Sequence, residues 1–236
     1  MNLILFTADE LNAGAQLTLS DHRFTQIHSV HRSQLGDTVK VGEINGLIGT
    51  GTITFIDDQQ VKLSVCLTDP PPQKIPLTII LALPRPKMIR RIFRTIAELG
   101  AERLIIINSY KVEKSFWQSP AITKDKVRTY LTDGLQQSKD TQLPAIEFHK
   151  RFKPFVEDEL TAIIDGKKAL LAHPNTGEAC PHQLDQPLCL AIGPEGGFTE
   201  YEAEKLQSIG FNGIHLGPRI LKVENALTTL VAKLYS

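Results

Sequence analysis

The chain has 236 residues, of which 42% are hydrophobic and 22% are charged, and three are cysteines. This is the composition of a globular protein with one large domain or two modest ones, and it excludes a disordered chain. No apolar run approaches the length of a membrane span, and the first residues lack the basic region of a signal peptide. Three cysteines without a Cys-x-x-Cys pair favour a reduced, cytoplasmic protein and argue against a metal site.

The formal net charge is zero, but the charges are unevenly distributed. Residues 73–128 hold 12 lysines and arginines against 4 aspartates and glutamates, a net charge of +8, whereas residues 1–72 and 129–236 each have a net charge of −4. A concentration of positive charge can mark an anionic partner such as RNA or DNA. It is equally consistent with a solvated helix face, so the charge pattern alone leaves both interpretations open.

Residues 1–72 predict a small β-rich domain. Short strand-like runs at residues 39–41, 51–56 and 61–67 follow one helix, which Ser20 is placed to cap. Short strands with glycine-rich turns and a single helix are typical of a small barrel. The proline-rich stretch at residues 69–73 predicts a stiff connection and therefore a domain boundary.

Residues 73–236 predict an α/β domain, because strand and helix patterns alternate along them. The expected strands are residues 77–83, 104–107, 169–172, 188–192 and 214–216, and the expected helices are residues 85–99, 123–138, 199–209 and 223–234. Such alternation implies a mostly parallel sheet covered by helices on both faces.

The helix expected at residues 85–99 has one apolar face and one basic face. The apolar side chains recur at helical spacing at Met88, Ile89, Ile92, Phe93 and Ile96. The polar face carries five cations against one acid, Glu98; the cations are Arg85, Lys87, Arg90, Arg91 and Arg94. Exposed helices usually mix acids with their cations, so this face favours contacts with nucleic-acid phosphates.

Residues 192–198, IGPEGGF, join a buried strand to a helix whose start at residues 199–202 has a capping-box pattern. A glycine-rich turn of this kind is where open α/β sheets bind small molecules. The spacing matches neither a Walker phosphate loop nor a dinucleotide fingerprint, and Glu195 would oppose a phosphate. The loop therefore predicts a ligand held mainly by backbone groups.

Residues 216–226, LGPRILKVENA, form a second glycine-proline loop after a strand of the same sheet. Two loops at one sheet edge can form the two walls of one pocket. No serine elbow, histidine triad or metal-ligand spacing accompanies them, although His173 stands at the end of an expected strand. A site poor in side-chain catalysts suits a reaction in which a cofactor carries the activated group.

These segments resemble the RsmE-type ribosomal RNA uridine methyltransferases of the SPOUT class. The two loops are close to the family patterns GPEGG-F-[ST]-x-x-E and LG-x-RILR-x-ETA. The stretches PKMIRRIFRTIAELGAERLIII and LQQSKDTQLP, and Leu35-Gly36-Asp37, also resemble family segments, so the likeness spans most of the chain.

The resemblance implies a PUA-like β-barrel RNA-binding domain over residues 1–72 and a SPOUT-type α/β domain with a trefoil knot over residues 73–236. It implies a homodimer and methyl transfer from S-adenosylmethionine to N3 of a uridine in small-subunit (16S) ribosomal RNA. The implied cofactor-binding residues are Leu171, Ala172, His173, Ile192, Gly193, Gly196, Gly197, Leu216, Gly217, Ile220, Leu221 and Ala226. The implied RNA-binding residues are Arg23, Arg32, Arg85, Lys87, Arg90, Arg91, Arg94, Gln137 and Lys222.

The same resemblance suggests catalytic roles for three residues. Arg219 would stabilise negative charge on uracil oxygens, and Glu195 or Glu224 would either accept the N3 proton or fix the loops. Three positions depart from the family pattern: Lys222 replaces an arginine, Asn225 a threonine, and Asp140 stands near an expected arginine, where it would repel RNA. Two alternatives stay open, namely a SPOUT ribose 2′-O-methyltransferase and a non-catalytic RNA-binding or assembly factor.

Overall fold

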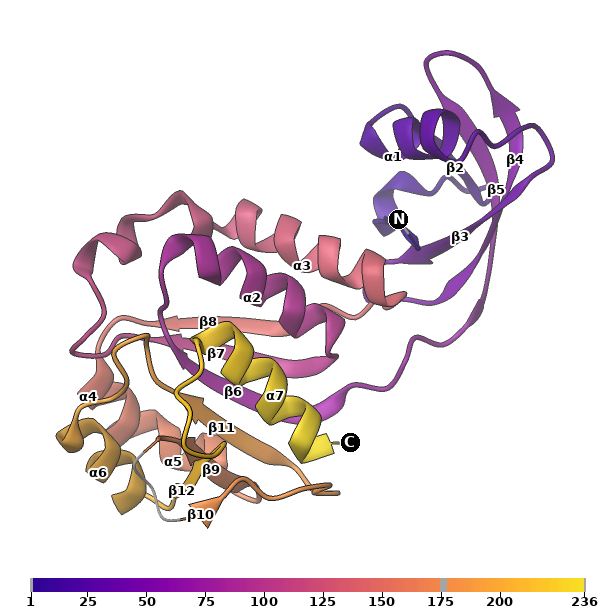
Figure 1. Ribbon diagram of the computed structural model, residues 1–236. Helices are drawn as coiled ribbons and strands as arrows, with labels where there is room; N and C mark the ends of the chain where they lie inside the picture. The colour runs from indigo at the N-terminus through magenta and orange to yellow at the C-terminus, as the bar shows by residue number, and fades with distance from the viewer. Residues whose placement is uncertain (1, 175–177, 236) are drawn as a thin grey trace. The chain divides into compact units, whose positions relative to one another are not determined.

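The structure, a computed structural model, describes residues 2–174 and 178–235. The chain divides into two compact units (Figure 1). The first contains Met1–Gln73 and Leu131–Leu143, and the second contains Lys74–Tyr130 and Pro144–Ser236. Among the described residues, no helix is long and apolar enough to cross a membrane.

The first unit is built on a curled five-stranded sheet with the order β1-β3-β4-β5-β2. Its strands are β1 (Ile4–Phe6), β2 (Gln16–Leu19), β3 (Thr38–Glu43), β4 (Ile48–Ile56) and β5 (Val61–Asp69). All neighbours are antiparallel except β1 and β3. Leu17, Ile27, Val41 and Leu63 are fully buried and form its core. The sequence predicted β3, β4 and β5 but missed the short strands β1 and β2.

One helical segment packs into this core. It consists of α1 (His22–Thr25) and a wider π-helical turn, η2 (Gln26–Val30), and a short turn, η1 (Ala8–Glu10), precedes it. The predicted cap was wrong by one residue, because the side chain of Asp21, not Ser20, accepts a hydrogen bond from the backbone N–H of Arg23. A carboxylate at this position also interacts favourably with the positive N-terminal end of the helix dipole.

The segment after residue 138 is bound to the hairpin between β3 and β4. Thr141 Oγ1 donates to the carbonyl of Gly46 at 2.6 Å, and the backbone N–H of Asn45 donates to the carbonyl of Thr141 at 2.8 Å. Asp140 is only 4% exposed, and its carboxylate accepts the N–H of Gln142. The expectation that Asp140 would repel RNA is therefore wrong, since its side chain does not reach the surface.

The second unit contains a seven-stranded sheet in which every pair is parallel, with the order β10-β12-β9-β11-β6-β7-β8. Its strands are β6 (Ile75–Ala82), β7 (Ala101–Ile107), β8 (Ala145–His149), β9 (Lys168–Ala172), β10 (Glu178–Ala179), β11 (Leu188–Ile192) and β12 (Asn212–His215). Every side chain of the central strand β11 is buried, as expected for a parallel sheet covered on both faces.

Helices cover both faces of this sheet, as the alternation predicted; α2 and α7 lie on one face and α5 on the other (Figure 1). The helical elements are α2 (Pro86–Glu98), η3 (Lys114–Gln118), η4 (Pro120–Ile122), α3 (Lys124–Ser138), α4 (Phe152–Pro154), η5 (Phe155–Glu159), α5 (Leu160–Ile164), α6 (Glu200–Ser208) and α7 (Val223–Tyr235). Pro86 begins α2, and Gly100, with φ +72°, follows its end.

Candidate functional site

The carboxyl ends of three adjacent strands bring the predicted loops together. In the sheet β9 lies between β12 and β11, and Ala172 is in register with both Ile192 and Ile214. Because the strands are parallel, the segments that follow them leave the same sheet edge side by side. This arrangement is the usual origin of a ligand site in an open α/β sheet.

A cavity of about 360 Å³ lies between these segments. Eleven of the twelve predicted cofactor-binding residues line it, together with Ile214, Val223 and Leu230. The exception is Leu171, whose side chain is fully buried within β9 and does not reach the cavity. The lining therefore combines apolar side chains with the backbone of two glycine loops.

The loop after β11 depends on its glycines. The N–H of Gly197 donates to the carbonyl of Pro194 at 2.7 Å, and Gly197 has φ +70°. A Cβ at Gly193 would lie 2.8 Å from the backbone nitrogen of Phe198. Gly193 therefore has no room for a side chain, and Gly197 adopts a backbone conformation that is strained for most other residues.

Glu195 lines the cavity, but its carboxylate is bound by a residue that does not line the cavity. Its Oε1 accepts a hydrogen bond from the backbone N–H of Arg85, at the start of α2, at 3.1 Å. A carboxylate at a helix N-terminus satisfies a backbone donor that the helix leaves unpaired. The geometry thus makes Glu195 a brace between the loop and α2.

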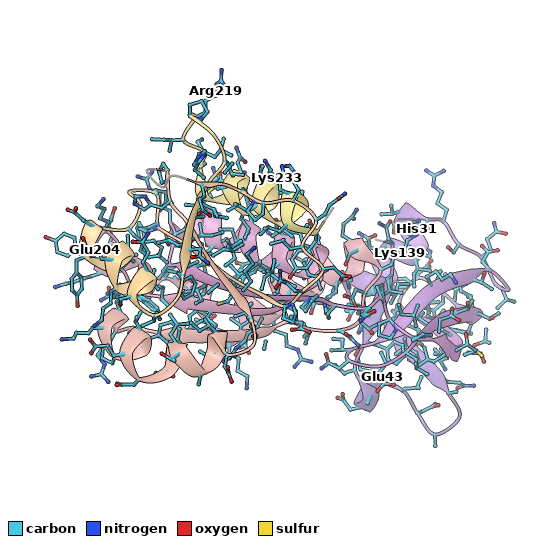
Figure 2. The ribbon with its side chains drawn as sticks, turned by 90° about the horizontal axis from the view of Figure 1, so that it is seen from below. His31, Glu43, Lys139, Glu204, Arg219 and Lys233 are labelled. Atoms are coloured by element: carbon cyan, nitrogen blue, oxygen red, sulfur yellow. The ribbon has the colours of Figure 1, made fainter. Side chains whose placement is uncertain are left out.

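The second loop turns at Gly217, whose φ is +107°. The Nδ1 atom of His215 accepts the N–H of Gly217 at 3.0 Å, which fixes the turn. Arg219 lies at the outer end of this loop with its side chain directed away from the domain (Figure 2), and it belongs to the rim of the cavity. Glu224 is in the first turn of α7 and does not line the cavity.

The long-range contacts of two residues next to the site were missed by the sequence reasoning. Lys111 Nζ donates to the carbonyl of Gly196 at 2.8 Å. Burial and, secondarily, the charge of Lys111 lower the pKa of His173 below its usual value. No local pattern marks Lys111, because it reaches the loop from the turn after β7, 85 residues earlier in the chain.

The second is Glu202, which is 3% exposed. It completes the predicted capping box with Thr199, which is confirmed. The same carboxylate also accepts the hydroxyl of Ser109 at 3.1 Å and the N–H of Tyr110 at 2.8 Å. The capping pattern revealed the local role of Glu202 but not these distant contacts.

The structure separates the predicted RNA-binding residues into two groups. Four cations at α2 are exposed, namely Arg85 at its N-cap and Lys87, Arg90 and Arg91 on the helix. Arg94 is half-buried, and its guanidinium lies 4.8 Å from the ring centroid of Tyr130. Lys222 is exposed at the cavity rim, and Arg32 and Gln137 are exposed in the first unit.

Arg23 is the exception. It is 9% exposed and donates hydrogen bonds to the carbonyl of Leu5 and to the carboxylates of Glu10 and Asp21. Its guanidinium has no surface to offer a phosphate. The assignment of Arg23 to RNA binding is therefore corrected to a structural role inside the first unit.

Comparisons with known proteins show the family of the chain. Residues 71–235 match the model of the RNA methyltransferase domain family. The ribosomal RNA small subunit methyltransferase E of Treponema pallidum is 31% identical over 96% of this chain and 87% of its own length. The ribosomal RNA small subunit methyltransferase E 1 of Borreliella burgdorferi is 24% identical over 96% of this chain and 94% of its own length.

Solved structures have the same fold. A ribosomal RNA small subunit methyltransferase E from Neisseria gonorrhoeae, solved with S-adenosylmethionine, is similar with a TM-score of 0.75 at 19% identity, covering 98% of this chain and 95% of that chain. A putative methyltransferase from Legionella pneumophila, also solved with S-adenosylmethionine, gives a TM-score of 0.75 at 22% identity over the same shares.

Fold and site together define an RNA methyltransferase domain preceded by a small β domain, which confirms the predicted fold class. More narrowly, the chain belongs to the ribosomal RNA small subunit methyltransferase E family.

Proposed function

We propose that the protein transfers a methyl group from S-adenosylmethionine to N3 of a uridine in small-subunit ribosomal RNA. Family membership makes the chain a ribosomal RNA methyltransferase. The cavity between the two glycine loops is the observation that carries the rest of the proposal. The Neisseria gonorrhoeae and Legionella pneumophila proteins were solved with S-adenosylmethionine, which supports this cofactor.

The residues around the cavity fit a nucleoside-like cofactor. Its volume of about 360 Å³ is within the range of roughly 300–1,000 Å³ found for small-molecule sites. Ile192, Leu221 and Leu230 offer apolar surface for an adenine ring, and the glycine loops offer backbone donors and acceptors for its polar edges and the ribose. Leu171 supports this wall from within β9 without touching the cavity.

The bound cofactor supplies an electrophilic methyl group. The protein must orient the uracil ring and stabilise the negative charge that develops on its oxygens as N3 loses its proton. We assign that stabilisation to Arg219 at the cavity rim, whose side chain would have to turn from its outward position toward the bound base. We assign Glu195 to loop support, because it braces α2, and we do not assign the base to Glu224, because it lies outside the cavity.

His173 is the remaining titratable group on the β9 wall of the cavity. Because burial and Lys111 lower its pKa, its imidazole is neutral at physiological pH and is in the form that accepts a proton. Its position suits a residue that takes up or relays the N3 proton.

RNA would be held by the exposed cations of α2 together with Lys222 and by exposed residues of the β domain, among them Arg32 and Gln137. A phosphate backbone needs several such point charges. Ribosomal subunits are assembled in the bacterial cytoplasm, and we place the protein there.

The proposal is tested by incubating the protein and S-adenosylmethionine with small ribosomal subunits from a strain that lacks it. The digested RNA is then analysed by mass spectrometry. We expect N3-methyluridine as the product; 2′-O-methyluridine would instead make the protein a ribose methyltransferase. If calorimetry detects no S-adenosylmethionine binding while RNA still binds, the protein is a non-catalytic RNA-binding factor.

A pair of glycine variants connects the product to the cavity. Gly193→Ala places a Cβ against the backbone of Phe198, so cofactor binding and methylation should both be lost. Gly14→Ala is the matched control, because a Cβ there meets only ordinary contact at 3.5 Å from Asn12. Equal methylation activity of the two variants would show that the cavity is not the cofactor site.

A further inference from the structure

The turn after β7 holds an aromatic ring out into solvent. The N–H of Val112 donates to the carbonyl of Ser109 at 3.0 Å, so Ser109–Val112 form a tight turn with Tyr110 and Lys111 at its corner. Tyr110 is 85% exposed, although a tyrosine ring is largely apolar. A large exposed aromatic side chain is a common feature of binding surfaces.

The backbone that carries this ring is fixed on both sides. Before the corner, the buried carboxylate of Glu202 accepts the hydroxyl of Ser109 and the N–H of Tyr110. After it, Val112 is 7% exposed and anchors the chain. Farther along, Trp117 Nε1 donates to Asn108 Oδ1 at 2.8 Å and closes the segment 108–117. An exposed ring on a fixed backbone is preorganised for a partner, because little entropy is left to lose on binding.

The same turn rests on the wall of the cavity. Besides the bond from Lys111 Nζ to the Gly196 carbonyl, a Cβ at Gly196 would lie 2.9 Å from Lys111 Cδ, so the lysine chain crosses this glycine closely. Lys111 is also near enough to lower the pKa of His173, which lines the cavity. Tyr110 is therefore the neighbour of a residue that contacts the cofactor loop.

The charges around the turn suit a polyanion. The segment 108–117 contains Lys111 and Lys114 against one acid, Glu113. After β8, the Nζ of Lys150 lies 6.0 Å from the centre of the Trp117 ring, which adds a third cation to the same segment. Aromatic rings among lysines are how proteins hold unpaired nucleotides, by stacking on the base and neutralising the phosphate.

We propose that the Ser109–Val112 turn is a base-stacking platform for the RNA substrate: Tyr110 stacks on an unpaired nucleobase at the methylation site while Lys111 and Lys114 face its phosphates. Glu202 is a positioning residue that acts through the turn. This inference rests on the proposed function, since it takes ribosomal RNA as the ligand.

The test compares Tyr110→Ala, Tyr110→Phe and Tyr201→Ala with the wild type. Tyr201 is the matched control, because it is a tyrosine on α6 with 55% of its surface exposed. Methyl incorporation into small subunits from a strain lacking the protein gives kcat and KM, calorimetry gives the affinity for S-adenosylmethionine, and sedimentation gives the oligomeric state.

We expect Tyr110→Ala to raise the KM for the subunits roughly 5- to 150-fold, which corresponds to the loss of one stacked base. Its affinity for S-adenosylmethionine should stay unchanged, and Tyr110→Phe and Tyr201→Ala should behave like the wild type. An unchanged KM in Tyr110→Ala overturns the platform, as does a change in oligomeric state, which would make the turn an interface between two copies of the chain. A wild type that methylates no RNA would refute the proposed function instead.

Discussion

Arg23 shows how a charged residue expected to contact a ligand can instead be buried in ion pairs within the protein. Arg23 is enclosed by Glu10, Asp21 and the carbonyl of Leu5. Burial alone would raise the pKa of the Glu10 and Asp21 carboxyls, but the hydrogen bonds and charge of Arg23 outweigh it and hold both pKa values below their usual range. The ion pairs therefore stabilise the first unit as long as both carboxyls are ionised.

At the residue scale we predict that Arg23→Leu lowers the free energy of unfolding by about 3 kcal/mol at neutral pH, because it leaves two partly buried carboxylates without their cation. Since both folded pKa values are depressed, the stabilisation is complete above the ordinary carboxyl pKa of about 4 and is lost as the pH falls through the lowered values. The difference in the free energy of unfolding between the variant and the wild type, measured by urea unfolding, should therefore become smaller at acidic pH.

Arg32→Leu is the control for this prediction, because Arg32 is exposed in the same unit and its loss should change stability by no more than about 0.5 kcal/mol. If the two variants unfold alike, Arg23 has no special structural role.

Among the elements, α2 was the most predictable and β8 the least. Four of the five predicted apolar side chains of α2 are fully buried, Met88 being half-buried, and Pro86 and Gly100 mark its ends. Strong periodicity with clear end signals explains this success. By contrast, β8 is an edge strand with no buried side chain, and the helical stretch 152–164 is broken into three short pieces, so neither has a clear pattern.

At the element scale we predict that Arg90→Glu with Arg91→Glu weakens RNA binding without changing the affinity for S-adenosylmethionine. Both side chains are exposed, whereas Arg94 packs on Tyr130 and would confuse the test. If each arginine contacts one phosphate, the slope of log affinity against log salt should fall by roughly 1.5 to 2. Filter binding of small-subunit RNA at several salt concentrations measures it.

The double variant Arg90→Lys with Arg91→Lys keeps the charge and is the matched control, so its salt slope should equal that of the wild type. If the slope of log affinity against log salt is unchanged in the glutamate variant, this helix face is a solvated surface that does not contact RNA.

At the scale of the whole molecule, the cavity loop presents apolar side chains to solvent. Ile220 is 82% exposed and Leu221 is 38% exposed, and both line the cavity. Apolar side chains of this size at a functional rim are typical of a surface that a partner covers. The homodimer that the family resemblance implies stays a prediction, and these exposed side chains offer a surface on which to test it.

We predict that Ile220→Asp shifts the protein from dimer to monomer in sedimentation experiments and raises the KM for RNA, because a buried charge in the interface would be unpaired. Leu35→Asp is the control: Leu35 is 67% exposed in the first unit and its change should leave the assembly intact. A wild type that sediments as a monomer at all concentrations would contradict this prediction.

Local sequence patterns predicted the α/β alternation and the two glycine loops, because turn chemistry, apolar periodicity and capping involve residues close together in the chain. Nine of the twelve residues that the family resemblance assigns to the cofactor lie in those two loops, and eleven of the twelve line the cavity. The folded structure was needed to find the burial of Arg23 and Asp140, the position of Leu171 outside the cavity, and the contacts of Lys111 and Glu202. These depend on packing between segments tens of residues apart, which leaves no local signal in the chain.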